Sequence, residues 1–422
     1  MTSPTTSLTE VYKLFLTSSG AQTDSRQLKK NQLFFALKGP NFDGNTYAEQ
    51  AVLEGANASI VDDPKVAATN KSCYLVDNVL NMLQELAQHH RNQFDIPVVA
   101  LTGSNGKTTT KELIGTVLKT RYNILATSGN LNNHIGVPLT LLQINANHRL
   151  AIIEMGANHL GEIEHLCTIT QPTHGLITNV GKAHLEGFGS EAGVLKAKTE
   201  LYRFLAQSNG TVFINKEDET LLNALPDTLS IYYTPTAFAV IEHHPTLSLC
   251  YNAIEIHTQL AGAYNVANIA AAVNIGLFFD VPLQKCIEAI EAYKPNNHRS
   301  QLLVKNNKTI VLDAYNANPS SMLAAVQAFS ERNGEKAVIL GTMAELGTHE
   351  EEEHKTIVNT VKSLGIDCCY WVGNPYKNLV SENWFSTVEN LMHHFKINPL
   401  KTAQILIKGS RSVSLERLLE VL

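Results

Sequence analysis

Residues 101–110 read LTGSNGKTTT and place two glycines ahead of a lysine and a threonine, a combination suited to binding phosphate. Glycines let the backbone approach phosphate closely, the lysine can reach the β- and γ-phosphates, and the threonine hydroxyl can hold Mg²⁺. The usual loop reads G-x-x-x-x-G-K-[ST], but here the glycine before Gly106 is Gly103, so this loop is shorter. Two interpretations follow: a short nucleotide loop, or a glycine-rich turn that leaves Lys107 in solvent.

The flanking sequence favours the nucleotide loop. The apolar stretch IPVVALTG runs directly into it, and KTTTKELIGTVLKT leaves it with the pattern of a helix. Backbone N–H groups at the start of a helix, together with the helix dipole, form an anion site. We therefore expect a strand, a phosphate loop and a helix over residues 96–120.

Further residues that could do chemistry follow other predicted strands. Glu154 ends the apolar run LAIIE, His184 follows THGLITNVG, and Lys196 and Lys198 lie in SEAGVLKAKTEL, at what reads as a helix start. Ligands of open α/β sheets gather at the carboxyl ends of strands. Each residue also has an ordinary interpretation: a carboxylate that caps a turn, a surface histidine, and solvated lysines. None of them decides the function alone.

The segment THEEEEH resembles the zinc motif H-E-x-x-H, but His349 and His354 are five residues apart instead of four. They would not share a helix face in the required way. We expect a helix start here, with Thr348 and Glu351 forming a capping box and the glutamates near the positive end of the dipole.

Length and composition indicate a globular protein of two or three domains, with 422 residues, 44% hydrophobic and 17% charged. The formal net charge of −6 gives no general attraction to nucleic acid or anionic membranes. LAGAYNVANIAAAVNIGLFF carries three asparagines, so we expect a buried helix and no membrane span. We also expect no signal peptide, no cysteine-based zinc or disulfide framework, and a cytoplasmic location.

Strand and helix patterns alternate over much of the chain, which predicts largely parallel sheets with helices on both faces. The first ninety residues hold short mixed elements and end in a helix that begins behind Asn78. QLLVKNNKTIVLDAY reads as a hairpin that turns at Asn306 and Asn307. The predicted fold class is α/β with three domains: a small mixed domain over 1–93, a central phosphate-loop domain over 94–296, and a Rossmann-like domain over 297–422.

The motifs together resemble one family. TGSNGKTTT, GNLNNHIGVPLTLL, EMGANHLGEIEHL, TNVGKAHLEGFGSEAGVLKAKTEL, YNVANIAAA, DAYNANPSSM, LGTMAELG and KGSRS occur in the order seen in the Mur ligases. These are ATP-dependent amide-bond-forming enzymes of bacterial peptidoglycan synthesis, and the resemblance covers nearly the whole chain. It is greatest to the last of the four ligases, which adds D-alanyl-D-alanine to UDP-N-acetylmuramoyl-tripeptide. The phosphate loop of this family also has the short form.

The resemblance implies a role for each matching residue. ATP would contact Gly103, Ser104, Asn105, Gly106, Lys107, Thr108, Thr109, Asn268, Arg299 and Asp313. Mg²⁺ would be held by Thr108, Glu154, His184 and Lys198, with Lys198 carbamylated and Lys196 as the competing candidate. Lys107, Lys198, His184 and Glu154 would form the catalytic set. The substrates would contact Thr23, Asp24, Ser25, Arg26, Asn132, Asn133, Asn316 and Asn318, in a protein expected to be a monomer.

The sequence departs from the family at two positions. Leu312 precedes Asp313 where consecutive aspartates are common, and Leu415 stands where methionine is expected. Neither change affects the implied chemistry. The alternatives are another Mur ligase, a folate polyglutamylating ligase or, in a different class, a phosphate-loop kinase or a nucleotide-binding switch.

Overall fold

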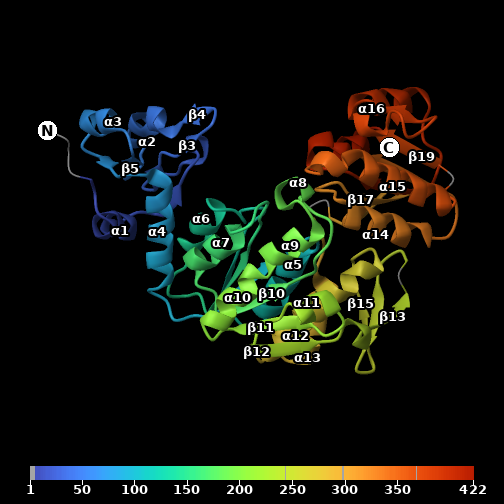
Figure 1. The fold of residues 1–422 in the computed structure, drawn as a ribbon, viewed down its shortest axis with the longest axis horizontal. Coiled ribbons are helices and arrows are strands. Elements are labelled where there is room, and N and C mark those ends of the chain that lie inside the picture. The colour runs from blue at the N-terminus through green and yellow to red at the C-terminus, as the bar shows by residue number, and fades with distance from the viewer. Residues whose placement is uncertain (1–4, 243, 297–298, 367) are drawn as a thin grey trace.

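The computed structural model describes residues 5–242, 244–296, 299–366 and 368–422, and it arranges them around three α/β units. The N-terminal unit and the C-terminal unit lie at opposite ends of the central one (Figure 1). The expected α/β fold class with largely parallel sheets is confirmed. Asn297, where we expect the third domain to begin, lies outside the described residues.

The N-terminal unit is built on a parallel sheet of order β1-β2-β5-β6, with a separate antiparallel pair β3–β4. Its elements are α1 (Leu8–Leu16), β1 (Ala21–Gln22), β2 (Leu33–Phe35), β3 (Lys38–Gly39), β4 (Phe42–Asp43), α2 (Ala48–Leu53), β5 (Ala58–Val61), α3 (Pro64–Thr69), β6 (Cys73–Leu75) and α4 (Val79–Arg91).

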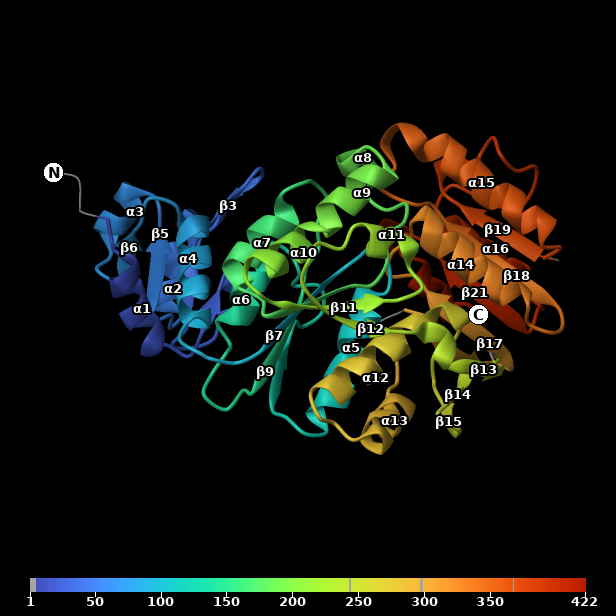
Figure 2. The same cartoon turned by 60° about the horizontal axis from the view of Figure 1, so that its bottom comes forward.

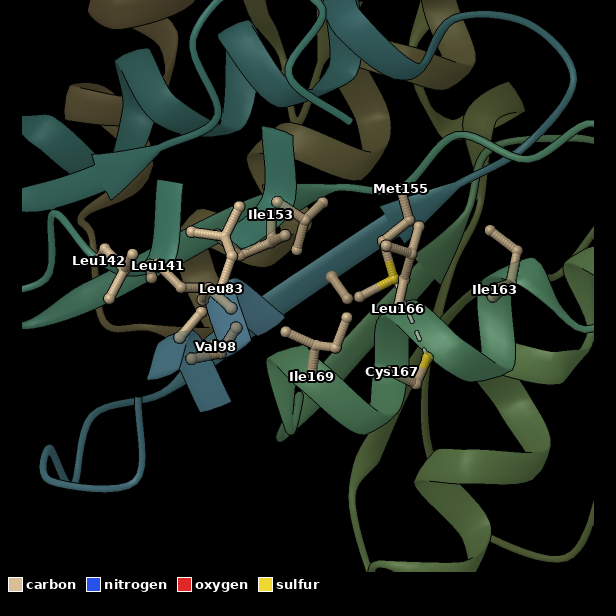
Figure 3. Packing of buried hydrophobic residues seen from close by; sticks show 14 of the residues in the cluster. Leu83, Val98, Leu141, Leu142, Ile153, Met155, Ile163, Leu166, Cys167 and Ile169 are labelled. Atoms are coloured by element: carbon tan, nitrogen blue, oxygen red, sulfur yellow. Dashed lines mark hydrogen bonds between the residues drawn. The ribbon is translucent and has the colours of Figure 1, made fainter. Parts of the chain in front are cut away.

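Helix α4 joins this unit to the central one. It begins as predicted behind Asn78, whose side chain accepts a hydrogen bond from the Asn81 N–H at 2.9 Å. Leu83 of α4 is fully buried and lies near Val98, Leu141 and Ile153 of the central unit (Figure 3). One continuous apolar core therefore spans both units.

The central unit carries a six-stranded, wholly parallel sheet of order β12-β11-β10-β7-β9-β8. Its elements are β7 (Val98–Thr102), α5 (Lys107–Lys119), β8 (Ile124–Ala126), α6 (Gly136–Leu141), β9 (Leu150–Glu154), α7 (Glu162–Thr170), β10 (His174–Ile177), α8 (Leu185–Phe188), α9 (Glu191–Lys198), α10 (Glu200–Gln207), β11 (Thr211–Asn215), α11 (Glu219–Asn223) and β12 (Leu229–Tyr233). A separate antiparallel sheet consists of β13 (Ala239–Glu242), β14 (Ser248–Tyr251) and β15 (Ile254–His257), and it is followed by α12 (Val266–Phe278) and α13 (Leu283–Ala292).

Strand β7 shows why helices cover both faces of this sheet. Its side chains alternate between two cores: Val98 and Ala100 pack on one side, and Val99 and Leu101 on the other. The first core includes α4, α6, α7 and α10, and the second includes α5, α12 and α13 (Figure 2). As expected, α12 is a buried helix.

The strand order places the phosphate loop at the point where the sheet changes its winding direction. From β7 the chain passes to β8 and β9 on one side, and then to β10, β11 and β12 on the other. Neighbouring connections therefore diverge above β7 and leave a crevice at its carboxyl end.

The C-terminal unit has a six-stranded sheet of order β16-β17-β21-β18-β19-β20, parallel except for the predicted hairpin β16–β17. Asn306 and Asn307 form the hairpin turn with left-handed φ angles of 48° and 60°. The elements are β16 (Gln301–Lys305), β17 (Lys308–Asp313), α14 (Pro319–Ser330), β18 (Lys336–Gly341), α15 (Glu350–Ser363), β19 (Cys368–Val372), β20 (Trp384–Phe385), α16 (Val388–Ile397) and β21 (Gln404–Lys408).

Two local predictions were wrong. The expected capping box does not form: α15 begins at Glu350 behind His349, and no side chain caps it, because a short 3-10 turn over Gly347–His349 leads into the helix. Lys196 and Lys198 lie in the last turn of α9 and not at a helix start. Thr199 separates α9 from α10, which begins at Glu200.

No helix of the described residues is both long enough and apolar enough to cross a membrane.

Candidate active site

A cavity of about 1260 Å³ lies where the three units meet. The N-terminal unit contributes Leu80, Asn81 and Gln84 from α4, and the central unit contributes the phosphate loop and the loops after β9 and β10. Arg299, Asp313, Tyr315, Asn316, Asn318, Glu345 and Lys408 border it from the C-terminal side. Residues far apart in the sequence therefore surround one volume large enough for several substrates.

The phosphate loop has the geometry expected of a strand-to-helix anion site. Gly103 and Gly106 have φ angles of 143° and 78°, values that L side chains rarely adopt. A Cβ at Gly103 would lie 2.0 Å from the Thr178 hydroxyl oxygen, so the loop requires glycine there. Helix α5 begins at Lys107 with no side chain capping it, which leaves its first N–H groups directed at the cavity.

The residues after β10 hold this loop from the side. The Ser104 N–H donates to the Asn179 carbonyl at 2.9 Å, and the Asn105 N–H donates to the Asn179 side-chain oxygen at 3.0 Å. The Thr178 hydroxyl donates to the Asn105 carbonyl at 2.6 Å. These three hydrogen bonds fix the loop against the residues after β10.

Lys107 extends its side chain across the loop that it follows. Its Nζ donates to the carbonyls of Gly103 at 2.6 Å and Ser104 at 3.3 Å. Burial, opposed by Glu154 and reinforced by Arg299, lowers the pKa of Lys107 to about 8. The ammonium therefore stays mainly charged at neutral pH, as phosphate binding requires.

Glu154, at the end of β9, lies next to the loop and is 1% exposed. Its Oε1 accepts hydrogen bonds from the Thr108 hydroxyl at 3.2 Å and from the Asn132 amide at 2.8 Å. Its Oε2 lies 3.3 Å from the ammonium of Lys111, which is equally buried and also donates to the Gly129 carbonyl. Lys111 thus orients the carboxylate and leaves Oε1 facing the threonine.

Lys198 is buried, whereas its competitor Lys196 is exposed on the same helix. The Lys198 Nζ donates to the Ala157 carbonyl at 3.3 Å and lies 5.2 Å from the centre of the Phe188 ring. Burial is the main cause that lowers the pKa of Lys198 to about 7, and the charge of Lys107 adds to it. A large fraction of this amine is therefore uncharged at neutral pH.

His184 precedes α8 with a left-handed φ of 51° and is not the surface residue that a lone loop histidine suggests. Its side chain is 20% exposed and contacts the Glu345 carboxylate of the C-terminal unit. That contact is the largest cause that lowers the pKa of Glu345. Nearby, Lys182 pairs with the buried Glu353 of α15 at 2.6 Å, which makes a second bridge between the units.

The C-terminal residues meet the site at the end of β17. Asp313 Oδ2 lies 2.5 Å from the buried ammonium of Lys408, the last residue of β21. The Arg299 guanidinium lies 3.9 Å from the centre of the Tyr315 ring. Asn318 caps α14, and its amide also donates to the Asn105 side-chain oxygen at 2.8 Å. The phosphate loop therefore contacts the C-terminal unit directly.

Several implied contact residues are engaged within the protein itself. Asn268 accepts from the Thr110 hydroxyl at 3.0 Å and lies directly under Gly106, where a Cβ would be 2.7 Å from its Oδ1. The Asn133 side chain accepts hydrogen bonds from two backbone N–H groups at the start of α6. The Asn316 side chain accepts one from the backbone N–H of Ala317. All three nevertheless line the cavity.

Thr23, Asp24, Ser25 and Arg26 are not among the residues that line this cavity. Arg26 instead makes paired hydrogen bonds with the Asp24 carboxylate, both at 2.9 Å, and these are the main cause that lowers the pKa of Asp24 to about 2. The segment lies at the carboxyl end of β1 in the N-terminal unit.

The described residues hold no group of three or more histidine, cysteine, aspartate or glutamate side chains that could alone bind a metal. The donor set fits Mg²⁺ nonetheless, since this ion keeps several waters and takes one or two protein oxygens plus phosphate oxygens. Thr108 and Glu154 offer two such oxygens, 3.2 Å apart, beside the loop.

No local sequence pattern points to the residues that pair with this site. Lys111 continues the helix after GKTTT and reads as a solvated lysine, yet it is 3% exposed. Lys408 and Glu345 lie in the motif stretches KGSRS and LGTMAELG, but the resemblance implies no role for either residue. Burial against a residue more than 40 positions away is a tertiary property that local pattern does not encode.

Known proteins resemble this chain over almost its full length. The models "Mur ligase family, catalytic domain", "Mur ligase middle domain" and "Mur ligase, glutamate ligase domain" match residues 18–91, 101–276 and 298–411. The UDP-N-acetylmuramoyl-tripeptide--D-alanyl-D-alanine ligase of Escherichia coli K12 is 35% identical, over 96% of this chain and 94% of that protein.

Solved structures agree with this match. MurF from Acinetobacter baumannii superposes with a TM-score of 0.84 at 30% identity, covering 95% of this chain and 92% of its own. MurF ligase from Thermotoga maritima, crystallised in complex with ADP, has a TM-score of 0.84 at 25% identity, covering 96% and 97%.

Proposed function

The chain belongs to the Mur ligase family, and from that premise we propose that it joins D-alanyl-D-alanine to UDP-N-acetylmuramoyl-tripeptide at the expense of ATP. The reaction would complete the peptide of the cytoplasmic peptidoglycan precursor. The observation that carries the proposal is that a phosphate loop, a buried carboxylate and residues of the C-terminal unit line one cavity. The buried Lys198 lies beside it and donates to the carbonyl of Ala157, which is one of the lining residues.

We assign ATP to the loop and the residues that face it from the C-terminal unit. The N–H groups at the start of α5 and the Lys107 ammonium would bind the β- and γ-phosphates. Arg299 and Asp313 border the same cavity and would hold the rest of the nucleotide. The remaining loop residues and Asn268 would shape the site, since Asn268 supports Gly106 from below.

We place Mg²⁺ at Thr108 and Glu154, where it would neutralise phosphate charge during transfer. Glu154 is held ready for this role, because Lys111 binds one carboxylate oxygen and leaves the other beside the Thr108 hydroxyl. His184 and a modified Lys198 would supply further ligands. Both pack against Phe188, with the His184 ring centre at 6.3 Å and the Lys198 Nζ at 5.2 Å from the ring centre.

We propose that Lys198 is carbamylated. Its Nζ would attack carbon dioxide, form an N–C bond and release a proton, which turns a cation into an anionic oxygen donor. An ammonium would repel Mg²⁺, whereas a carbamate suits a hard cation. Lys198 meets the requirement because it is buried and the charge of Lys107 in the loop helps to lower its pKa, while Lys196 is exposed.

The reaction begins with attack by the terminal carboxylate oxygen of the tripeptide on the γ-phosphorus, which breaks the bond to ADP. Lys107 and the loop N–H groups would stabilise the charge on the transferred phosphoryl group. The amine of D-alanyl-D-alanine then attacks the acyl carbon, a proton leaves the nitrogen, and phosphate departs with the former carboxylate oxygen. The residues act by alignment and charge, and no protein nucleophile is needed.

The N-terminal unit would bind the UDP part of the substrate at Thr23–Arg26, so the tripeptide would extend past α4 toward the loop. Asn132, Asn133, Asn316 and Asn318 would contact substrate near the phosphates. We also propose domain limits at 1–93, 94–296 and 297–422, and a monomeric enzyme.

A substrate-omission assay tests the assignment. The purified protein should release phosphate from ATP only when both UDP-N-acetylmuramoyl-tripeptide and D-alanyl-D-alanine are present. Turnover with a single amino acid in place of the dipeptide would indicate another ligase of the family, and turnover without any amine would indicate a kinase or switch. Tripeptides that end in meso-diaminopimelate or in L-lysine should be compared in the same assay.

A further inference from the structure

The cavity holds four carboxylates among the described residues, and three of them are committed to partners. Glu154 is bound by Lys111, Thr108 and Asn132, and Asp313 by Lys408. The two oxygens of Glu162 are used by its own loop: Oε2 accepts from the N–H groups of Asn158 and His159, and Oε1 lies 3.6 Å from the His159 ring.

Glu345 is the exception. Its side chain is 47% exposed, and Oε2 contacts the His184 ring. Its Oε1 makes no hydrogen bond or ion pair with any described residue. The carboxylate therefore presents a free oxygen to the cavity beside His184, in a region that otherwise carries the cations Lys107, Arg299 and Lys408.

The backbone is built to hold Glu345 in this position. Its φ is 60°, a left-handed value that costs a non-glycine residue on the order of 1 kcal/mol or more. The N–H of Glu186 donates to the Glu345 carbonyl at 3.1 Å and fixes the loop against the start of α8. Strain of this kind persists only where the surroundings enforce it.

A buried histidine supports the same loop from behind. His354 is fully buried; its Nε2 accepts from the Met343 N–H at 3.0 Å, and its Nδ1 lies 2.7 Å from the Glu350 carbonyl. Tyr376 packs edge-on against that ring and donates to the Gly341 carbonyl at 3.2 Å. These contacts hold Gly341 and Met343 at the carboxyl end of β18, and they therefore support the loop that carries Glu345.

We propose that Glu345 binds the amino group of the incoming D-alanyl-D-alanine and holds it beside the acyl phosphate. The inference rests on the proposed function. A free dipeptide amine is mainly an ammonium at neutral pH, so a cavity dominated by cations needs an anionic group to receive it. Glu345 is the carboxylate of the cavity with a free oxygen, and it approaches from the C-terminal side, opposite to the tripeptide.

Kinetics of Glu345→Gln test the proposal, once the wild-type protein has shown ligase activity in the omission assay. The substitution keeps the size and the contact with His184 but removes the charge. We expect the KM for D-alanyl-D-alanine to rise about 10- to 100-fold, the loss typical of a charge-assisted hydrogen bond, with the KM values for ATP and tripeptide within about twofold. Glu351→Gln, an exposed carboxylate outside the cavity, serves as the matched control and should leave all three unchanged.

A second measurement separates substrate binding from support of His184. Hydroxylamine, a small nucleophile that is uncharged at neutral pH, should intercept the acyl phosphate equally well in wild type and in Glu345→Gln. ADP binding measured by calorimetry at varied Mg²⁺ should also be unchanged. A raised Mg²⁺ requirement, a raised KM for ATP, or an unchanged KM for the dipeptide would overturn the proposal and make Glu345 a support for His184.

Discussion

At the scale of single residues, burial distinguishes the two lysines that sequence pattern leaves as competitors. Lys198 and Lys196 are two positions apart in α9, yet one is 1% exposed and the other faces solvent. Carbon dioxide reacts with the neutral amine, so the lowered pKa of Lys198, about 7, supports the proposal that this residue is the carbamylated one.

Lys198→Ala should therefore abolish turnover, whereas Lys196→Ala should leave it nearly unchanged. Native mass spectrometry at neutral pH should show a labile adduct of one carbon dioxide in wild type and in Lys196→Ala, but not in Lys198→Ala. At fixed dissolved carbon dioxide the adduct should increase as the pH rises through about 7, because the neutral amine increases. Normal turnover of Lys198→Ala would refute the role.

Lys111 is the counter-charge of Glu154, and its removal should cost stability as well as activity. Lys111→Met leaves a buried carboxylate without its counter-charge, so we expect the free energy of unfolding to fall by about 3–5 kcal/mol. Urea denaturation measures this loss. The double variant Lys111→Met with Glu154→Gln should recover a large part of it, and a loss below 1 kcal/mol in the single variant would contradict the pairing.

At the scale of elements, the conformation of the short phosphate loop depends on the close approach of the carboxyl ends of β7 and β10. Gly103→Ala places a Cβ within 2.0 Å of the Thr178 hydroxyl, at a φ of 143°, so the loop must move. We expect ADP affinity, measured by calorimetry, to fall at least about tenfold.

Gly115→Ala is the matched control for that change. Gly115 lies inside α5, where a Cβ would meet nothing closer than 3.7 Å, so alanine should stabilise the protein by about 0.5–1 kcal/mol and leave ADP affinity intact. Equal ADP binding by Gly103→Ala and wild type would show that the loop does not need this glycine.

Elements with strong local signals were predictable from sequence, and tertiary partnerships were not. The strand–loop–helix unit, the Asn78 cap and the Asn306–Asn307 turn follow from periodicity and turn chemistry. The capping box at Thr348 did not form, because a 3-10 turn competes for that position. Lys111, Lys408 and Glu345 were missed as site partners, since each becomes informative only when the fold brings a distant residue to it.

At the scale of the whole molecule, the two outer units are attached to the central unit in different ways. The N-terminal unit shares a continuous apolar core with it through α4. Across the C-terminal boundary, three polar pairs lie around the site: Asn318 with Asn105, Lys182 with Glu353 and His184 with Glu345. The apolar contacts there are made by Leu185 and Ala261, which pack into the core of the C-terminal unit. The polar pairs can open and re-form as substrates enter, which suits a site completed by closure of that unit.

Leu83→Ala should reveal this difference. The residue is fully buried in the shared core, so we expect a loss of about 2–5 kcal/mol that destabilises the N-terminal and central units together. Hydrogen exchange should show faster opening in both units and little change in the C-terminal one. Leu53→Ala, at a side chain that is 74% exposed, should change stability by less than about 0.5 kcal/mol. Faster exchange confined to the N-terminal unit would contradict the shared core.

The central claim is that the cavity activates a carboxylate with ATP and then joins it to D-alanyl-D-alanine. The most direct measurement uses tripeptide labelled with ¹⁸O in its terminal carboxylate, with mass analysis of both products. The account predicts a UDP-linked pentapeptide and one ¹⁸O in each released phosphate, because the carboxylate oxygen leaves with the phosphoryl group. Unlabelled phosphate, or phosphate released without pentapeptide, would contradict it.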